Sequence, residues 1–148
     1  MALFNAFNIS ASGMSAQRFR SDIISQNIAN IDTTRTEDGK VYRRKCVTFA
    51  ERTDTPFDHV LARAQGRHVT GTGVKVYSVY EDTETDLKMV YDPSHPDADE
   101  NGYVSYPNVN MIAEMTNLID ASRSLEANVT AFNASKSMAL KGLEIGSK

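Results

Sequence analysis

Residues 25–36 read SQNIANIDTTRT, and this stretch ends a long helical pattern. Asn27 and Asn30 lie three residues apart and bracket Ile28, before the sequence changes to Asp and Thr. Asparagine is a weak helix former because its side-chain amide competes for backbone hydrogen bonds. Two asparagines near the end of one helix therefore indicate a specific hydrogen-bonding role.

The sequence before this stretch predicts one long helix from Leu3 to Ile31. Apolar side chains recur there with alternating four- and three-residue spacing, the heptad pattern of helices that pack along a seam. No proline interrupts the pattern, so we expect about 28 helical residues, or roughly 42 Å. The seam positions are Leu3, Phe7, Ser10, Met14, Gln17, Ser21, Ile24, Ile28 and Ile31.

The C-terminal segment repeats this spacing and predicts a second long helix that begins after Pro107. Asn108 or Asn110 can cap its first turn, and Gly146 can end it. The seam positions are Met111, Met115, Leu118, Ser122, Leu125, Val129, Phe132, Lys136, Ala139 and Leu143.

Both seams contain polar residues, which lower stability but favour one register and one partner. On the N-terminal helix, Phe19 and Ile23 lie nearly opposite the seam. A hairpin of two helices would leave these side chains in water. We therefore expect them to be covered either by other subunits or by the middle of the chain.

The middle of the chain has a different character and predicts a small β-rich insert. FDHVLARAQ at 57–65 predicts a short helix, and alternating β-branched and aromatic residues predict strands. The predicted strands are 41–51, 73–81, 87–92 and 103–106, with a loop at 92–102. The expected fold is mainly α, with long terminal helices that pack as a coiled-coil-like pair around short strands and loops. Its parts are an N-terminal helix at 1–32, the β-rich middle at 33–107 and a C-terminal helix at 108–148.

The composition of the 148 residues fits one folded domain and excludes a general attraction to polyanions. The net charge is −3, so neither nucleic acid nor anionic lipid is an expected partner. Residues 1–70 carry a net charge of +3 and residues 71–148 a net charge of −6, an asymmetry that suits self-association.

No apolar run approaches the ~18 residues that span a bilayer. The N-terminal sequence lacks the pattern of a cleaved signal peptide.

No pattern of residues indicates catalysis, a metal or a cofactor. DADENG at 97–102 matches the first half of an EF-hand calcium loop, but Asn108 falls where that loop needs a bidentate Glu. The three histidines lack zinc spacing, and Cys46 is expected to be a buried structural thiol. The basic run YRRK at 42–45 is expected to be the solvated edge of a strand rather than a nucleic-acid site. We therefore expect no enzyme activity, no catalytic residue, no metal and no cofactor.

Two parts of the sequence resemble the axial proteins of the bacterial flagellum. SASGMSAQRF at 10–19 and the box Asn-Ile-Ala-Asn at 27–30 are similar to the N-terminal motif of rod and hook proteins. YDPSHPDADENGYVSYPNVNMIAEM at 91–115 narrows the similarity to the proximal rod proteins. The short chain fits, because distal rod and hook proteins are larger. The resemblance implies a structural subunit of the basal-body rod, the drive shaft that transmits torque and surrounds the export channel.

The resemblance also implies a location and a set of partners. Rod proteins are exported unfolded and uncleaved through the flagellar type III apparatus, and they stack helically in the periplasm. Their terminal helices form the inner tube, with the β-rich part outside. The implied partners are copies of the chain, other proximal and distal rod proteins, and the export-gate and adaptor proteins at the rod base. Nucleic acid and direct membrane insertion are not implied.

We expect the terminal helices to form the contacts between subunits and to become ordered on assembly. The amides of Asn27 and Asn30 would then reach adjacent subunits and set the register, unless they only fray the helix end. The expected interface residues are Leu3, Phe7, Met14, Phe19, Ile23, Ile24, Asn27, Ile28, Asn30, Ile31, Met111, Met115, Leu118, Leu125, Val129, Phe132 and Leu143.

Two other functions stay open from the sequence alone. A secreted coiled-coil adaptor would form a discrete oligomer with a closed interface, whereas a rod subunit needs an open one. A small calcium-binding module would use the acidic residues at 82–86 and 97–102.

Overall fold

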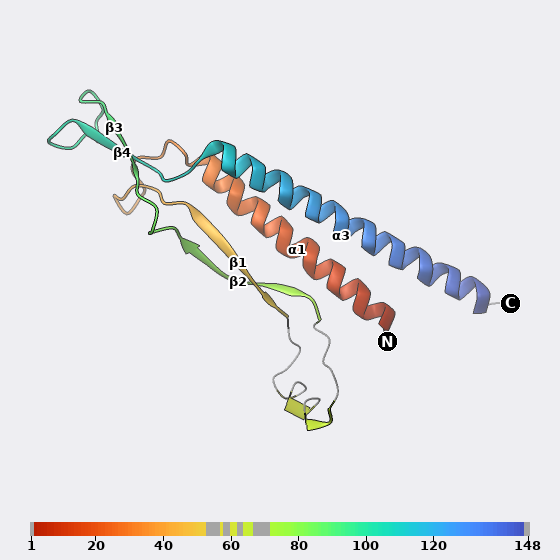
Figure 1. The fold of residues 1–148 in the computed structure, drawn as a ribbon. Coiled ribbons are helices and arrows are strands. Elements are labelled where there is room, and N and C mark those ends of the chain that lie inside the picture. Colours follow the sequence, from red (N-terminus) through yellow and green to blue (C-terminus); the bar gives the residue numbers. More distant parts are fainter. Residues whose placement is uncertain (1, 53–56, 58–59, 62–63, 67–71, 147–148) are drawn as a thin grey trace. The chain divides into compact units, whose positions relative to one another are not determined.

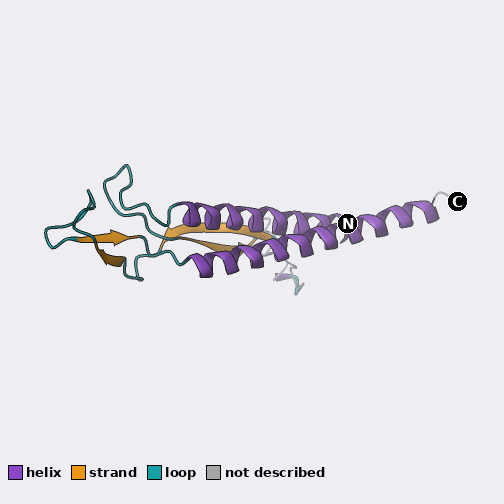
Figure 2. Ribbon diagram, turned by 90° about the horizontal axis from the view of Figure 1, so that it is seen from above, coloured by secondary structure: helices purple, strands orange, loops and turns teal. Residues whose placement is uncertain are grey.

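A computed structural model of the chain describes residues 2–52, 57, 60–61, 64–66 and 72–146, and its side chains from Asn5 onward. In this part of the chain, two long helices flank four strands in the sequence (Figures 1 and 2). The helices are α1 (Ala2–Ala29) and α3 (Met111–Gly146), and the strands are β1 (Lys45–Glu51), β2 (Val74–Glu81), β3 (Lys88–Tyr91) and β4 (Tyr103–Tyr106). The prediction of a mainly helical fold with a small β-rich insert is confirmed.

The short helix expected at 57–65 falls partly outside the described residues. Positions 58–59 and 62–63 are not described, and the chain is helical at 57, 60, 61 and 64.

Helix α1 ends at Ala29, inside the box of asparagines and two residues before the predicted end at Ile31. It contains 28 residues, and a turn follows in which the backbone N–H of Thr33 donates to the carbonyl of Asn30 at 3.2 Å. The side-chain amide of Asn30 donates back to the carbonyl of Gln26 at 2.8 Å. The same carbonyl accepts the backbone N–H of Asn30 at 3.1 Å, so Asn30 bonds to the last turn of the helix through both its backbone and its side chain.

Helix α3 begins with Asn110 as its cap. Its Oδ1 accepts the backbone N–H groups of Ile112 at 3.0 Å and of Ala113 at 3.2 Å, which satisfies two of the free donors of the first turn. The helix continues for 36 residues. Of the two caps that the sequence offers, the structure uses Asn110, and Asn108 has another role.

The strands form two separate two-stranded sheets, β1–β2 and β3–β4. Strands β3 and β4 are antiparallel, with Lys88 opposite Tyr106 and Tyr91 opposite Tyr103. Strands β1 and β2 are antiparallel as well, because Arg52 N–H donates to Gly73 O at one end and Asp82 N–H donates to Arg44 O at the other, both at 2.8 Å.

The chain divides into two compact units, and each contains parts of both long helices. Unit 1 comprises Met1–Phe19, Thr48–Tyr77 and Ala121–Lys148, and unit 2 comprises Arg20–Val47 and Ser78–Asp120. Within the described residues, no helix is long and apolar enough to cross a membrane.

In unit 1, α1 and α3 pack side by side through aromatic and small residues. The rings of Phe7 and Phe132 meet edge to face, with centroids 5.0 Å apart. Gly13 lies against Asn128, where an added Cβ would come within 2.6 Å of Oδ1. The absence of a side chain at position 13 therefore allows this close approach.

In unit 2, the same two helices pack around a core that is partly polar. Val104 and Ile24 are buried, and Asn27 and Glu114 are buried with them. The guanidinium of Arg20 donates to Asn117 Oδ1 at 3.4 Å. The pairing of the terminal helices is thus found in each unit, while the coiled-coil form of their packing stays a prediction.

Candidate functional site

Asn27 is completely buried in unit 2 and uses every hydrogen-bonding position of its side chain. Nδ2 donates to Lys45 O at 2.9 Å and to Glu114 Oε2 at 3.0 Å. Oδ1 accepts Tyr42 OH and Lys45 N–H, both at 2.9 Å. A side-chain amide has two donors and two acceptor positions, so the capacity of Asn27 is filled within the chain.

Glu114 carries the charge of this cluster and is only 1% exposed. Its Oε1 accepts Arg44 Nε and Nη2, each at 2.8 Å, while Oε2 accepts Asn27. A buried carboxylate is costly unless it is paired and hydrogen-bonded, and here it is both. Burial opposes the charge of Arg44, but the hydrogen bond and charge of Glu114 outweigh it, so the pKa of Arg44 is raised above its ordinary value.

Tyr42 closes the cluster on the side of the loop that precedes β1. Its hydroxyl donates to Asn27, and its ring is buried beneath Lys45 Nζ, 5.6 Å from the ring centroid. Burial raises the pKa of Tyr42, and the negative charges of Glu81 and Glu114 raise it further. The phenol is therefore held in its neutral, donating form.

Asn108 links the cluster to the end of β2. Its Nδ2 donates to Asp82 O at 2.9 Å and to Thr85 O at 3.2 Å, and its Oδ1 accepts Arg44 N–H at 2.8 Å. Asn27, Tyr42, Arg44, Lys45, Asn108 and Glu114 form what we call the buried polar network. It ties the end of α1, the start of β1, the end of β2 and the start of α3 into one joint.

The basic run at 42–45 belongs to this network, so its prediction as the solvated edge of a strand is wrong. Tyr42 is buried, Arg44 is paired with Glu114, and only Lys45 lies in a strand. The sequence alone does not reveal this pairing, because Arg44 lies in the loop before β1 and its partner carboxylate lies on α3, 70 positions further along the chain. Cys46 is half-buried rather than buried, and Arg44 Nη1 donates to its Sγ at 3.2 Å.

The two asparagines of the box have different roles. Asn30 is half-buried, donates to Gln26 O and accepts Thr33 OH at 3.1 Å, so it shapes the turn after α1. The expectation that the Asn27 amide bonds to an adjacent subunit is wrong, because its four positions are filled inside the chain. The alternative of a frayed helix end is wrong for Asn27 too, since this residue is buried and fixed.

The acidic residues between β2 and β4 shape turns. Asp82 Oδ1 accepts the N–H groups of Glu84 and Thr85 at 3.1 and 3.0 Å, and Oδ2 accepts Thr85 OH at 2.8 Å. These bonds from Thr85 and Glu84 lower the pKa of Asp82. Asp99 Oδ1 accepts two backbone N–H groups in the same way. Where the structure describes the chain, it has no group of three or more potential metal ligands.

The residues expected at subunit contacts differ widely in exposure. Ile24 and Asn27 are buried, and the side chain of Leu3 lies outside the described side chains. The half-buried ones are Phe7, Met14, Ile23, Ile28, Asn30, Ile31, Leu118, Leu125 and Phe132. The exposed ones are Phe19, Met111, Met115, Val129 and Leu143.

Helix α3 also exposes apolar residues that the seam pattern omits. Ile112 is 77% exposed and Ile145 is 79% exposed. Further exposed apolar side chains are Ile119, Met138 and Leu140. Their signal in the sequence is an apolar residue off the heptad seam, the same signal that singled out Phe19 and Ile23 on α1.

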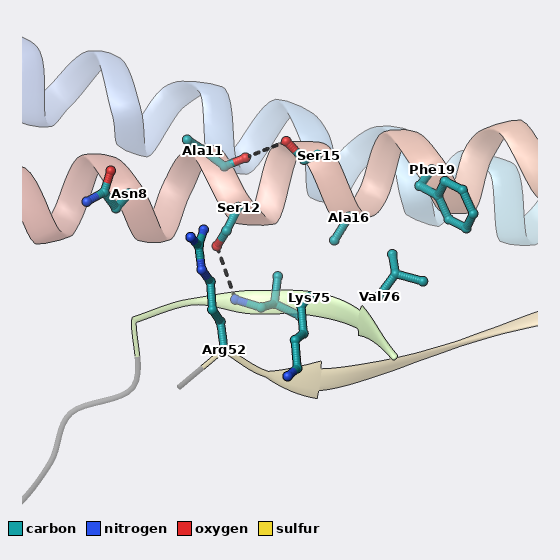
Figure 3. A pocket seen from close by; sticks show the side chains of 10 residues that line it. Asn8, Ala11, Ser12, Ser15, Ala16, Phe19, Arg52, Lys75 and Val76 are labelled. Atoms are coloured by element: carbon teal, nitrogen blue, oxygen red, sulfur yellow. Dashed lines mark hydrogen bonds between the residues drawn. The ribbon is translucent and has the colours of Figure 1, made fainter. Parts of the chain in front are cut away.

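Unit 1 contains an open groove between α1 and the β1–β2 ribbon (Figure 3). Its volume is about 480 Å³. Ser12 holds the two sides together, because its Oγ donates to Ile9 O and accepts Val74 N–H at 3.1 Å. The lining residues are Asn8, Ala11, Ser12, Ser15, Ala16, Phe19, Arg52, Val74, Lys75 and Val76.

Known proteins match both ends of the chain and nearly its full length. Residues 7–35 match the family described as "Flagella basal body rod protein", and residues 100–145 match "Flagellar basal body rod FlgEFG protein C-terminal". A protein of Bacillus subtilis named flagellar basal-body rod protein FlgC is 44% identical over 150 residues, which cover 99% of each chain. The chain belongs to the FlgC family. FlgC proteins of Borreliella burgdorferi and Salmonella typhimurium are 44% and 42% identical, over 98% and 99% of each chain.

Membership in the FlgC family confirms the resemblance to flagellar rod proteins and the prediction of a structural protein rather than an enzyme. The two family matches contain three of the six residues of the buried polar network. Asn27 lies in the first matched region, and Asn108 and Glu114 lie in the second.

Proposed function

We propose that this chain is a structural subunit of the flagellar basal-body rod and that it polymerises through α1 and α3. The mode of assembly is inferred from one observation: α3 exposes large apolar side chains on faces that its own chain leaves uncovered. Leu143 is 71% exposed and Ile145 is 79% exposed. Removing such a side chain from water stabilises a contact by about 1.5–3 kcal/mol, so several contacts per subunit support a stable tube.

The contact residues in this proposal are those expected from the sequence, except that the buried residues Ile24 and Asn27 act indirectly. The amide of Asn27 holds the joint on which the start of α3 and the turn at Asn30 are placed. The exposed residues Phe19, Met111, Met115, Val129 and Leu143 contact neighbours directly. The half-buried seam residues contribute where neighbouring helices approach.

The buried polar network gives such a subunit a fixed joint between its helices and its strands. A shaft that transmits torque needs a stiff connection between its inner and outer parts. In unit 2, fully paired amide, guanidinium and carboxylate groups supply that connection, because a changed geometry would leave buried groups unpaired.

Partners and location follow from the same proposal. The chain contacts its own copies, proximal and distal rod proteins, and the export-gate and adaptor proteins at the base of the rod. It reaches the periplasm through the flagellar type III apparatus, and its apolar helix faces are covered on assembly.

The test uses a bacterium from which the gene for this chain has been deleted. Leu143→Asp with Ile145→Asp places charges in the proposed contacts, and Ser137→Asp places one at an exposed polar position of the same helix as a control. Swimming and rods in isolated basal bodies are scored. We expect rods with the wild-type and control chains and none with the double variant. Normal rods with the double variant would contradict polymerisation through this helix end.

A further inference from the structure

The two units of the chain carry opposite charge. Unit 1 contains nine Lys and Arg against five Asp and Glu, a net charge of +4. Unit 2 contains seven against fourteen, a net charge of −7. When two copies meet, unit 1 against unit 2 is attractive, whereas either unit against its own kind is repulsive.

Unit 1 presents the groove between α1 and the β1–β2 ribbon. Along the groove, α1 exposes small side chains at Ala11 and Ser15, and Phe19 is 38% exposed at one end. Small side chains allow the backbone of another helix to approach closely. Arg52 rises from the end of β1 toward α1, as Figure 3 shows, and among the described residues no carboxylate lies within ion-pair distance of it.

Unit 2 presents a short apolar stripe on the exposed side of α3. Ile112, Met115 and Ile119 are 77%, 53% and 53% exposed, and their spacing of three and four residues places them on one helix face. The exposed carboxylate of Asp120, the last residue of unit 2 on α3, flanks the stripe.

We propose that the groove of unit 1 in one copy receives the stripe of α3 from a second copy, with Arg52 facing Asp120 across the contact. This inference rests on the proposed function and names the partner of its helix surface. Ile112, Met115 and Ile119 lie over Ala11 and Ser15 and against Phe19. The contact joins a net positive unit to a net negative one.

Such a contact is head-to-tail, because the groove and the stripe are different surfaces. After one such contact the first copy still has a free stripe and the second a free groove, so further copies can add at both ends and form an open assembly. The opposite charges also act against pairing of groove with groove and of stripe with stripe.

Charge reversal tests the proposal in the gene-deleted bacterium. Arg52→Glu and Asp120→Arg each place like charges across the contact, and Lys88→Glu reverses an exposed cation of β3 as a control. The amount of chain in isolated basal bodies is measured by mass spectrometry, together with swimming. We expect each single reversal to lower incorporation by roughly twofold to tenfold, and the control to leave it unchanged.

Rescue makes the test specific. The chain with both reversals restores the pair with exchanged signs, so its incorporation returns to the wild-type value. Cells that express the two single-reversal chains together also recover, because each groove then accepts the stripe of the other chain. Single reversals without effect, or losses that neither combination rescues, would overturn the proposal. Absence of the wild-type chain from basal bodies would instead overturn the proposed function.

Discussion

The side-chain amide of Asn27 donates to Oε2 of Glu114 at 3.0 Å, and 87 positions of sequence separate the two residues. This bond connects the last turn of α1 with the first turn of α3. Because both side chains are buried, the end of α1 and the start of α3 meet through paired polar groups.

Asn27→Ala should destabilise the chain far more than Asn30→Ala. The first change leaves Glu114 Oε2, Tyr42 OH and both backbone groups of Lys45 without their partner, and we expect a loss of about 2–4 kcal/mol in the free energy of unfolding. The second removes a half-exposed turn contact and costs less than about 1 kcal/mol. Urea unfolding of the full chain, followed by circular dichroism, measures both. Equal losses would contradict the different roles assigned to the two asparagines.

Arg44→Ala should lower the free energy of unfolding by about 3 kcal/mol, because it leaves the buried Glu114 carboxylate unpaired. Arg35→Ala is the matched control. Arg35 Nη1 lies 3.8 Å from Asp97 Oδ1, and 71% of the Arg35 side chain is exposed. Such a pair contributes less than about 1 kcal/mol to the free energy of unfolding. Combining Arg44→Ala with Glu114→Gln removes the orphaned charge, so part of the loss should be regained. A double variant less stable than Arg44→Ala would show that Glu114 acts mainly through other partners.

Tyr42 should make the folded chain sensitive to alkaline pH. Its pKa is raised above the ordinary 10.0 by burial and nearby carboxylates, so the folded state favours the neutral phenol. The stability from this preference is fully present below pH 10 and is lost as pH rises through the higher folded pKa. Urea unfolding between about pH 8 and pH 12 should show a smaller alkaline loss for Tyr42→Phe than for the wild type. If the free energy of unfolding falls equally with pH in Tyr42→Phe and in the wild type, Tyr42 is not the source of the alkaline sensitivity.

Gly13→Ala and Gly142→Ala should have opposite effects, although both replace a helical glycine. At position 142 nothing lies within 4 Å of an added Cβ, so the change should stabilise the chain by about 0.5–1 kcal/mol. At position 13 the Cβ meets Asn128 at 2.6 Å, which should cancel or reverse that gain. Asn128→Ala should restore the gain in the Gly13→Ala background. Urea unfolding of the three variants checks this, and a plain gain for Gly13→Ala alone would contradict the close helix contact.

The sequence predicted what depends on local periodicity. Helix α1 was expected at Leu3–Ile31 and is found at Ala2–Ala29, and the four strands were found inside their expected ranges. Heptad spacing, the absence of proline and the alternation of β-branched residues are local signals. They are sufficient to assign secondary structure here.

The sequence did not predict which polar residues meet. Asn27 and Asn30 look equivalent in a helix pattern, and their difference arises from Tyr42, Lys45 and Glu114, which approach from distant segments. Glu114 was overlooked because a single acidic residue between apolar seam positions usually faces solvent. The run at 42–45 was misassigned for the same reason, since pairing of Arg44 depends on tertiary structure.

The most direct test of the central claim measures whether the exposed face of α3 is covered in the rod. A single cysteine is placed at Leu143 or, as a control, at Lys88 of β3, in a chain that carries Cys46→Ser. Its reaction with a maleimide is timed in the free chain and in isolated basal bodies. We predict that the cysteine at position 143 reacts readily in the free chain and much more slowly in basal bodies, while the cysteine at position 88 reacts at similar rates in both. Equal reactivity of position 143 in the two states would contradict assembly through the terminal helices.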